Sequence, residues 1–149
     1  IVVGECRGGE ALDMLQAMNT GHDGSMTTVH ANTAKDAISR IETLVMFSGV
    51  ELPSKAIREQ IAGGIHMIVQ LSRFSDGTRK ITDIAELTGM EGSVITLQSI
   101  FTYQQEGVDA DRKVVGKFRP SGVVPKFFDE LQQKGIDFSR EIFIGTSRI

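Results

Sequence analysis

The spacing of apolar residues changes at Gly63-Gly64, and this change most constrains how the chain can fold. Before the two glycines, apolar residues recur every three or four positions, which is typical of helices with one buried face. After them, apolar and polar residues alternate, which is typical of strands. The sequence therefore predicts an α/β part over residues 1–64 and a β-rich part over residues 65–149.

In the first part, β-branched residues predict a buried strand over residues 1–4 and a second strand over residues 25–31. A capping-box pattern at Thr33 predicts the start of a helix. Helices are predicted over residues 8–19, from Thr33 to Gly49, and from Pro53 to Gly64. The order strand–helix–strand–helix–helix favours parallel strands joined by helical crossovers.

In the second part, the alternating residues Ile65, Met67, Val69 and Leu71 predict a strand, and Asp76-Gly77 predicts a hairpin turn. Short strands joined by turns favour an antiparallel arrangement. The remaining predicted elements are a return strand over 79–87, a turn over 88–92, strands over 95–103 and 112–119, and a short closing helix over 125–134.

The composition is that of an ordinary globular chain. Its 149 residues are 40% hydrophobic, which is enough for one core, and its formal net charge is −3. Arg73, Arg79 and Lys80 are the nearest approach to a basic cluster, and they flank the predicted hairpin turn. Since nucleic-acid binding usually needs a clustered basic face, we expect a solvated hairpin end and no direct nucleic-acid binding.

Cys6 is the only cysteine, so an intrachain disulfide is excluded and a reducing cytoplasm is the expected compartment. A nucleophilic role for Cys6 would need an activating neighbour, and we do not expect one. The apolar runs are only a few residues long, whereas a membrane span needs roughly 20. Because residues 1–4 read as a strand with no lead-in, we also expect further chain upstream.

Glu5 directly follows the first predicted strand. Open α/β sheets bind ligands at the carboxyl ends of their strands, which is where Glu5 is expected. In nucleotide hydrolases such an acid helps to hold Mg²⁺ or orients the attacking water. An acid at this position can also simply stabilise the N-terminus of the next helix, so Glu5 alone leaves both interpretations open.

Two of the three histidines, His22 and His30, lie in the polar, glycine-flanked stretch TGHDGSMTTVHAN. Zinc needs three or four ligands at short spacing, and two histidines with Cys6 on another strand do not supply them. His30 ends a strand predicted to run parallel to the first, so it should emerge beside Glu5. There it could sense a terminal phosphate, with the Thr28 hydroxyl reaching a phosphate-bound water, and simple packing remains the alternative.

The run GECRGGEALDMLQAMNTGHDGSMTTVHAN, residues 4–32, resembles the Walker B region and the His box of the type II and type IV secretion and pilus-assembly ATPases. The shared elements are Gly-Glu-x-Arg, Glu10-Ala11, Asn-Thr-Gly-His and Thr-Thr-x-His-Ala-Asn. Downstream, RFSDGTRKITDIAELTGMEG, ITLQSIF and SGVVPKFFDEL resemble the CpaF-type branch, which drives tight-adherence (Tad/Flp) pili. The resemblance covers nearly the whole chain.

This resemblance implies the fold and the site residues. The fold would be the C-terminal half of a RecA-like P-loop NTPase domain, an α/β part followed by a β-rich antiparallel appendage and a short closing helix. Glu5 would be the catalytic Walker B glutamate, with an indirect contact to Mg²⁺, and His30 the principal His-box histidine near the γ-phosphate. The further nucleotide-binding residues would be His22, Thr28, Arg7 and Arg40.

The resemblance also implies cofactors and partners. The full-length protein would use ATP and Mg²⁺ and would form a homo-hexamer. It would act in the cytoplasm, peripherally at the inner membrane, together with inner-membrane platform proteins of a secretion or pilus machine.

The P-loop pattern G-x-x-x-x-G-K-[ST] does not occur in the sequence. The nearest candidate, Gly116-Lys117-Phe118, has Asp111 in place of the first glycine and Phe118 in place of Ser or Thr. Because the family carries its P-loop upstream, we expect this chain to be inactive alone. Two alternatives stay open, a type IV ATPase that translocates DNA or protein and a non-catalytic RecA-like interaction module.

Overall fold

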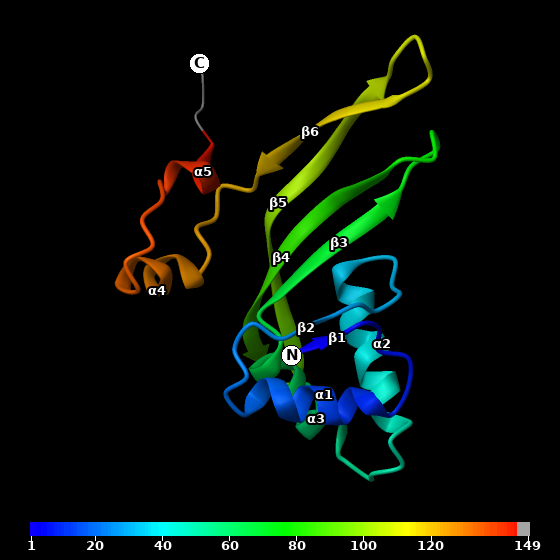
Figure 1. Ribbon diagram of the computed structural model, residues 1–149, viewed down its shortest axis with the longest axis vertical. Coiled ribbons are helices and arrows are strands. Elements are labelled where there is room, and N and C mark those ends of the chain that lie inside the picture. The colour runs from blue at the N-terminus through cyan, green and yellow to red at the C-terminus, as the bar shows by residue number, and fades with distance from the viewer. Residues whose placement is uncertain (146–149) are drawn as a thin grey trace. The chain divides into compact units, whose positions relative to one another are not determined.

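The computed structural model describes residues 1–145. Contacts divide them into two units. The helical unit comprises Ile1–His66 and Leu87–Leu97, and the sheet unit comprises Met67–Glu86 and the described residues from Gln98 onward. Figure 1 labels the helices and strands of both units.

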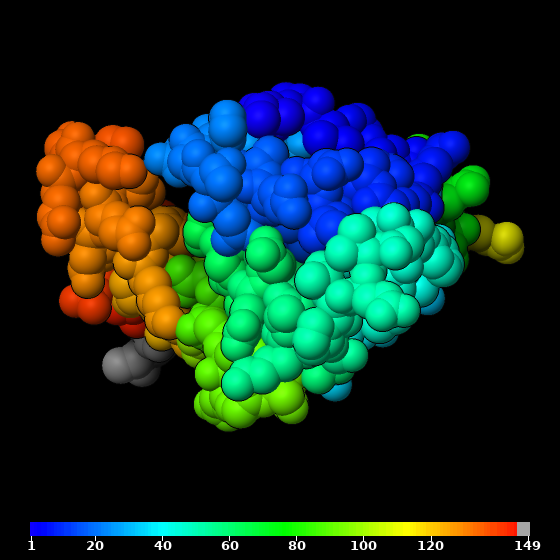
Figure 2. Space-filling view, turned by 90° about the horizontal axis from the view of Figure 1, so that it is seen from below, coloured from blue at the N-terminus to red at the C-terminus, as the bar shows by residue number. Residues whose placement is uncertain are grey.

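The helical unit is built on three helices, α1 (Glu10–Asn19), α2 (Ala34–Met46) and α3 (Ser54–Gly64). Each of the three helices contacts the other two, and Figure 2 shows the blue α1 segment lying against the turquoise segment that leads from α2 into α3. The core positions share helical spacing and are fully buried; they include Leu15, Leu44, Val45, Ile57 and Ile61. The helical periodicity therefore predicted the core of this unit correctly.

The start of α2 confirms the predicted cap. The Thr33 hydroxyl oxygen accepts a hydrogen bond from the Asp36 backbone N–H at 3.0 Å, which satisfies one of the free donors of the first turn. The helix ends at Met46, three residues before Gly49, whose φ of +75° suits a residue without a side chain. The next helix, α3, begins immediately after Pro53, as expected.

The first two strands, β1 (Val2–Val3) and β2 (Met26–Thr27), pair in parallel with Val2 opposite Met26. The parallel pairing is confirmed, but both strands are shorter than the predicted 1–4 and 25–31. The expectation that the first strand is buried is wrong, because Val2 is 74% exposed. Among the described residues these two strands have only each other as strand neighbours, so their outer edges lack a strand partner.

A four-stranded sheet follows, in the order β3 (Met67–Arg73), β4 (Arg79–Glu91), β5 (Val94–Val108) and β6 (Val114–Pro120). The pairs β3–β4 and β5–β6 are antiparallel, as predicted. The hairpin turn at Asp76-Gly77 is also confirmed, with Gly77 at a φ of +81°. The turn predicted over 88–92 is wrong in extent, because β4 continues to Glu91 and reverses only at Gly92, where φ is +62°.

The alternating apolar side chains of β3 lie on its more exposed face. Met67, Val69 and Leu71 are 42%, 44% and 58% exposed, whereas the residues between them are more covered. β3 is an edge strand, and the apolar cluster of the sheet unit forms elsewhere, around Ile100 on β5. The period of the pattern therefore identified the strand but did not identify which face is covered.

The closing segment contains two short helices, α4 (Phe127–Gln133) and α5 (Glu141–Ile144). The first lies within the predicted 125–134, and the second was not predicted. Phe128 and Phe143 are buried with Ile100, and their rings meet edge to face with centroids 5.9 Å apart. The Glu86 carboxylate accepts a hydrogen bond from the Lys126 N–H at 2.9 Å, just before α4 begins.

Candidate functional site

The backbone holds the carboxyl ends of β1 and β2 together beyond the two strands themselves. The Cys6 N–H donates to the Thr28 carbonyl at 2.9 Å, and the Thr28 hydroxyl donates to the Gly4 carbonyl at 2.7 Å. These bonds place residues 4–6 beside residue 28. As a result, the two side chains that follow these strands, Glu5 and His30, emerge at the same edge, as the sequence predicted.

Glu5 contacts two side chains, one at each carboxylate oxygen. Its Oε1 lies 3.0 Å from His30 Nε2, and its Oε2 lies 2.5 Å from Arg7 Nη2. The Glu5 side chain is 22% exposed, whereas those of Arg7 and His30 are 76% and 91% exposed. A largely covered carboxylate is thus held by two solvent-facing groups that other anions can reach.

The electrostatics of Glu5, Arg7 and His30, called the trio below, favour an ionised Glu5. The hydrogen bond from Arg7 is the largest cause that lowers the pKa of Glu5; burial opposes it, and the charges of Arg7 and His30 add to it. In turn, Glu5 raises the pKa of Arg7. The arrangement can therefore supply a carboxylate as a proton acceptor once Arg7 or His30 moves, and it presents donors to an anionic ligand.

The loop that carries Arg7 is fixed by Glu10, the first residue of α1. Glu10 Oε1 accepts hydrogen bonds from the backbone N–H of Arg7 at 2.7 Å and of Gly8 at 3.0 Å. These bonds lower the pKa of Glu10, and the bond from Arg7 has the largest effect. A Cβ on Gly9 would lie 2.7 Å from Ser48 Cα, so a side chain there would collide with backbone.

Sequence reasoning assigned no role to Gly9 or Glu10. The available signal was a glycine pair followed by an acid at the first position of a helix, where a carboxylate can accept from free N–H groups.

His22 lies in the loop after α1 and is held there. The His22 Nδ1 is 3.0 Å from the Ala17 carbonyl oxygen, and the His22 carbonyl accepts a hydrogen bond from the Ser25 hydroxyl at 2.8 Å. None of the contacts described for residues 1–145 joins His22 to Glu5 or His30. Instead, His22 lines a hollow of about 60 Å³ together with Met18, Asp23, Gly24, Ser25, Gly64 and His66.

The two remaining predicted nucleotide-binding residues differ in their surroundings. The Thr28 hydroxyl proton is used in the bond to Gly4, so toward a ligand Thr28 Oγ1 retains only acceptor capacity. Arg40 is exposed on α2 and has no partner among the contacts described for residues 1–145. The structure does not bring Arg40 into contact with Glu5, and its role stays a prediction.

Asn19 is a third residue, after Gly9 and Glu10, that sequence reasoning left without a role. Its Nδ2 donates to the Leu15 carbonyl at 2.8 Å and to the Gln60 carbonyl at 2.9 Å, which ties the end of α1 to α3. A Cβ on Gly63 would lie 2.6 Å from Asn19 Oδ1. The glycine pair that ends α3 therefore makes room for Asn19, and this contact fixes the point where the His22 loop begins.

Cys6, next to Glu5 in the sequence, is a further candidate reactive group. Cys6 is buried, and burial raises the pKa of its thiol, which disfavours the nucleophilic thiolate. No group of three or more His, Cys, Asp or Glu side chains within residues 1–145 is arranged to hold a metal ion. No helix in the described part of the chain is long and apolar enough to cross a membrane.

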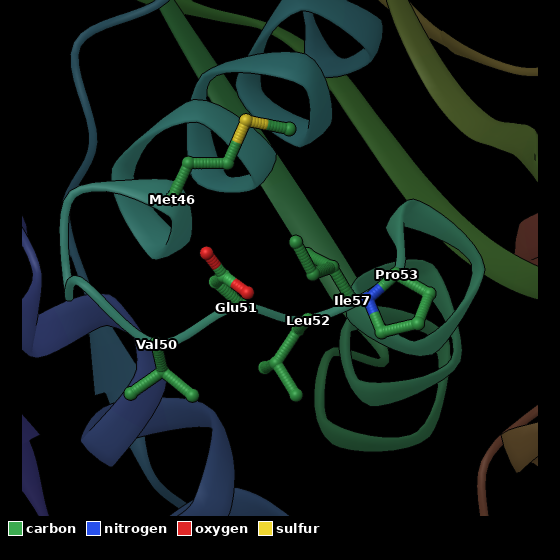
Figure 3. Close-up of a pocket in the computed structure, with 6 residues that line it drawn as sticks. All are labelled: Met46, Val50, Glu51, Leu52, Pro53 and Ile57. Atoms are coloured by element: carbon green, nitrogen blue, oxygen red, sulfur yellow. The ribbon is translucent and has the colours of Figure 1, made fainter.

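A hollow of about 500 Å³ lies between the end of α2 and the start of α3 (Figure 3). Its lining residues are Met46, Val50, Glu51, Leu52, Pro53 and Ile57. Glu51 is the single ionisable side chain among them. The chemistry of the helical unit is therefore concentrated at Glu5, Arg7 and His30 and not at this hollow.

The chain is similar to known secretion proteins in sequence and in structure. The family model described as "Type II/IV secretion system protein" matches residues 1–119. A putative conjugal transfer protein of Mycobacterium tuberculosis is 39% identical over 94 residues, which are 63% of this chain and 26% of that protein. The type IV secretion system protein VirB11 of Bartonella quintana is 40% identical over 86 residues, which are 56% of this chain and 24% of that protein.

A solved structure is also similar, that of the VirB11 ATPase from the Brucella suis type IV secretion system in complex with sulphate. Its TM-score is 0.54 at 31% identity, covering 58% of this chain and 27% of that one. The chain thus spans about a quarter of the length of these relatives. The likeness confirms the predicted fold class, an α/β part and an antiparallel β-rich part corresponding to the C-terminal half of a RecA-like domain. The chain belongs to the type II/IV secretion system protein family.

Proposed function

We propose that this chain carries the hydrolysis half of the ATP site of a secretion or pilus-assembly motor, with Glu5 as its catalytic carboxylate. The observation that supports the proposal most is the 3.0 Å contact between Glu5 Oε1 and His30 Nε2. It joins the carboxyl ends of two parallel strands, the edge at which α/β sheets bind ligands. The chain's membership of the type II/IV secretion system protein family and its likeness to a VirB11 ATPase structure also support ATP hydrolysis.

In this proposal, each residue of the trio has its own task. Glu5 orients the attacking water and accepts its proton, which requires a carboxylate oxygen free of Arg7 or His30. His30, 91% exposed, donates to the terminal phosphate and so reports its presence. Arg7 supplies positive charge to the same group. His22, Thr28 and Arg40 are assigned to nucleotide binding around this centre.

The residues present suit an indirect contact with Mg²⁺. Mg²⁺ prefers oxygen ligands and keeps several of its waters. Both oxygens of Glu5 are already engaged, by Arg7 Nη2 and His30 Nε2, so Glu5 fits a water-mediated contact better than a direct one. When bound with ATP, Mg²⁺ would neutralise phosphate charge.

The proposal extends to the whole protein. Residues 1–64 form the Walker B and His-box part and residues 65–149 the β-rich part of a RecA-like domain whose P-loop half lies upstream. The missing P-loop pattern and the quarter-length coverage of the relatives support this division. Such a protein would act as a homo-hexamer at the cytoplasmic face of the inner membrane, beside platform proteins, and the 149-residue chain alone would not turn over ATP.

Within the family, we propose the CpaF-type branch that assembles Tad/Flp pili, on the strength of the segments GMEG and ITLQSIF. The second candidate is a type IV secretion ATPase, which the names of the VirB11 and conjugal transfer relatives favour. A strain without the gene separates them, since loss of surface pili supports the first and loss of conjugal transfer or protein secretion supports the second. A non-catalytic interaction module would show no ATP turnover at all.

The test of the catalytic role is Glu5→Gln in the full-length protein. The amide cannot accept the proton of the water, so we expect kcat for ATP hydrolysis to fall by roughly 10²–10⁴-fold while nucleotide binding is retained. The matched control is Glu51→Gln, an exposed glutamate between α2 and α3. Equal turnover in the Glu5→Gln and Glu51→Gln proteins would contradict the proposal.

A further inference from the structure

The segment from Cys6 to Gly9, which carries Arg7, is held at both ends. At its start, the Cys6 side chain is only 3% exposed, and its N–H is bonded to Thr28. At its end, Gly9 lies so close to Ser48 that a Cβ does not fit. Between these two points, the backbone is held by the Glu10 carboxylate.

One oxygen of Glu10 gathers two backbone donors. Oε1 accepts from Arg7 N–H at 2.7 Å and from Gly8 N–H at 3.0 Å, both outside the helix. The first turn of α1 then closes on the same segment, because Ala11 N–H donates to the Gly8 carbonyl at 3.1 Å. The side chain of Glu10 thus folds the preceding loop back onto its own helix.

This arrangement matters for Arg7, whose side chain is long and mostly in solvent. An exposed arginine loses rotamer freedom when it holds one geometry, and this loss offsets much of the gain from such an ion pair. Arg7 Nη2 nevertheless lies 2.5 Å from Glu5 Oε2. When the Arg7 backbone is fixed, its guanidinium samples fewer positions, and a larger share of them lie in contact with Glu5.

We propose that Glu10 is a positioning residue that holds Arg7 against Glu5 and thereby orients the carboxylate of the candidate site. The consequence for hydrolysis rests on the proposed function of Glu5. The placement of Arg7 does not, so the two are tested separately.

The placement is tested on the 149-residue chain with Glu10→Ala. We expect the Arg7 and Gly8 amides to lose protection from hydrogen exchange. We also expect the pKa of Glu5, followed by NMR of its side-chain carboxyl, to rise toward the value in Arg7→Ala. In the double variant Arg7→Ala/Glu10→Ala the pKa should rise no further than in Arg7→Ala, because Glu10 acts through Arg7.

The control is Asp13→Ala, which removes the other carboxylate of the first turn of α1. Loss of a nearby negative charge alone lowers the pKa of Glu5, so a purely electrostatic role and a positioning role have opposite signs. Glu10→Gln keeps an acceptor oxygen without the charge and serves if Glu10→Ala does not fold; we expect a smaller rise. A fall or no change in the pKa of Glu5 in the Glu10 variants would overturn the inference.

The second arm measures ATP turnover in the full-length protein. Because misplaced catalytic groups cost rate more than binding, Glu10→Ala should lower kcat roughly 10–100-fold with little change in the KM for ATP. Combining it with Arg7→Ala should slow the protein no further than Arg7→Ala alone, and additive losses would overturn the inference. If Glu5→Gln leaves turnover intact, the proposed function fails, whereas the NMR result on Arg7 placement still stands or falls by itself.

Discussion

Two carboxylates in this chain are held in opposite ways, Glu5 beside β1 and Asp76 at the turn between β3 and β4. The partners of Glu5 are two mostly exposed side chains, Arg7 and His30, that an incoming anion can draw away. The Asp76 carboxylate instead accepts from the backbone N–H and hydroxyl of Thr78 and from the Val114 N–H, at 2.6–2.9 Å.

This difference distinguishes a functional carboxylate, Glu5, from a structural one, Asp76. The hydrogen bonds of Asp76 come mainly from backbone groups, which cannot swing away, and they join the β3–β4 turn to the start of β6. They lower the pKa of Asp76 to about 2, with the Thr78 side chain as the largest cause. The carboxylate whose partners can be exchanged is the one that suits chemistry, and the carboxylate with fixed partners stabilises the fold.

The largest effect on stability is expected for a substitution at Gly9, in the closely packed segment that follows Glu5. In Gly9→Ala the new Cβ would lie 2.7 Å from Ser48 Cα and 2.9 Å from the Phe47 carbonyl oxygen, and neither is a flexible side-chain end. We expect the free energy of unfolding to fall by about 1–3 kcal/mol, measured by urea denaturation. Gly4→Ala is the control, since nothing lies within 4 Å of its Cβ, and an equal loss there would contradict the close approach.

A smaller effect is expected for Asp76, and it depends on pH. Because folding lowers the pKa of Asp76 from 3.8 to about 2, its contribution is complete above pH 4 and is lost as pH falls through about 2. The urea midpoint of Asp76→Asn should therefore lie below that of the unchanged chain at pH 6, and the gap should narrow between pH 4 and 2. A difference in urea midpoint that stays constant between pH 4 and 2 would show that the ionised Asp76 does not stabilise the fold.

The sequence was most informative where local chemistry decides the structure. Thr33 followed by Asp36 predicted a helix start, and Asp76-Gly77 predicted a turn, because each depends on a few neighbouring atoms. The pairing of Glu5 with His30 followed from one further step, that parallel strands end at one edge.

The parts that were missed depend on contacts between distant segments. The closeness of Gly9 to Ser48 and the bond from Asn19 to Gln60 join residues about 40 positions apart, and no periodicity encodes them. The exposure of Val2 depends likewise on which strands flank it and not on its own β-branched side chain. Local pattern therefore predicted the candidate catalytic pair, whereas the scaffold that positions Arg7 became visible only in the structure.

The smallest expected effect addresses the comparison most directly, because it uses salt in place of a mutation. Ions screen attraction between exposed charges, and at 1 M salt the screening length is only about 3 Å. The pKa of Glu5, lowered mainly through Arg7, should therefore rise toward its ordinary value between 0.05 and 1 M NaCl, by a fraction of a unit. The pKa of Asp76 should stay near 2, because its uncharged donors, from Thr78 and Val114, are little affected by salt. Carboxyl NMR titrations of both residues in one sample give the comparison, and equal shifts would mean that both groups are held by exposed charge alone.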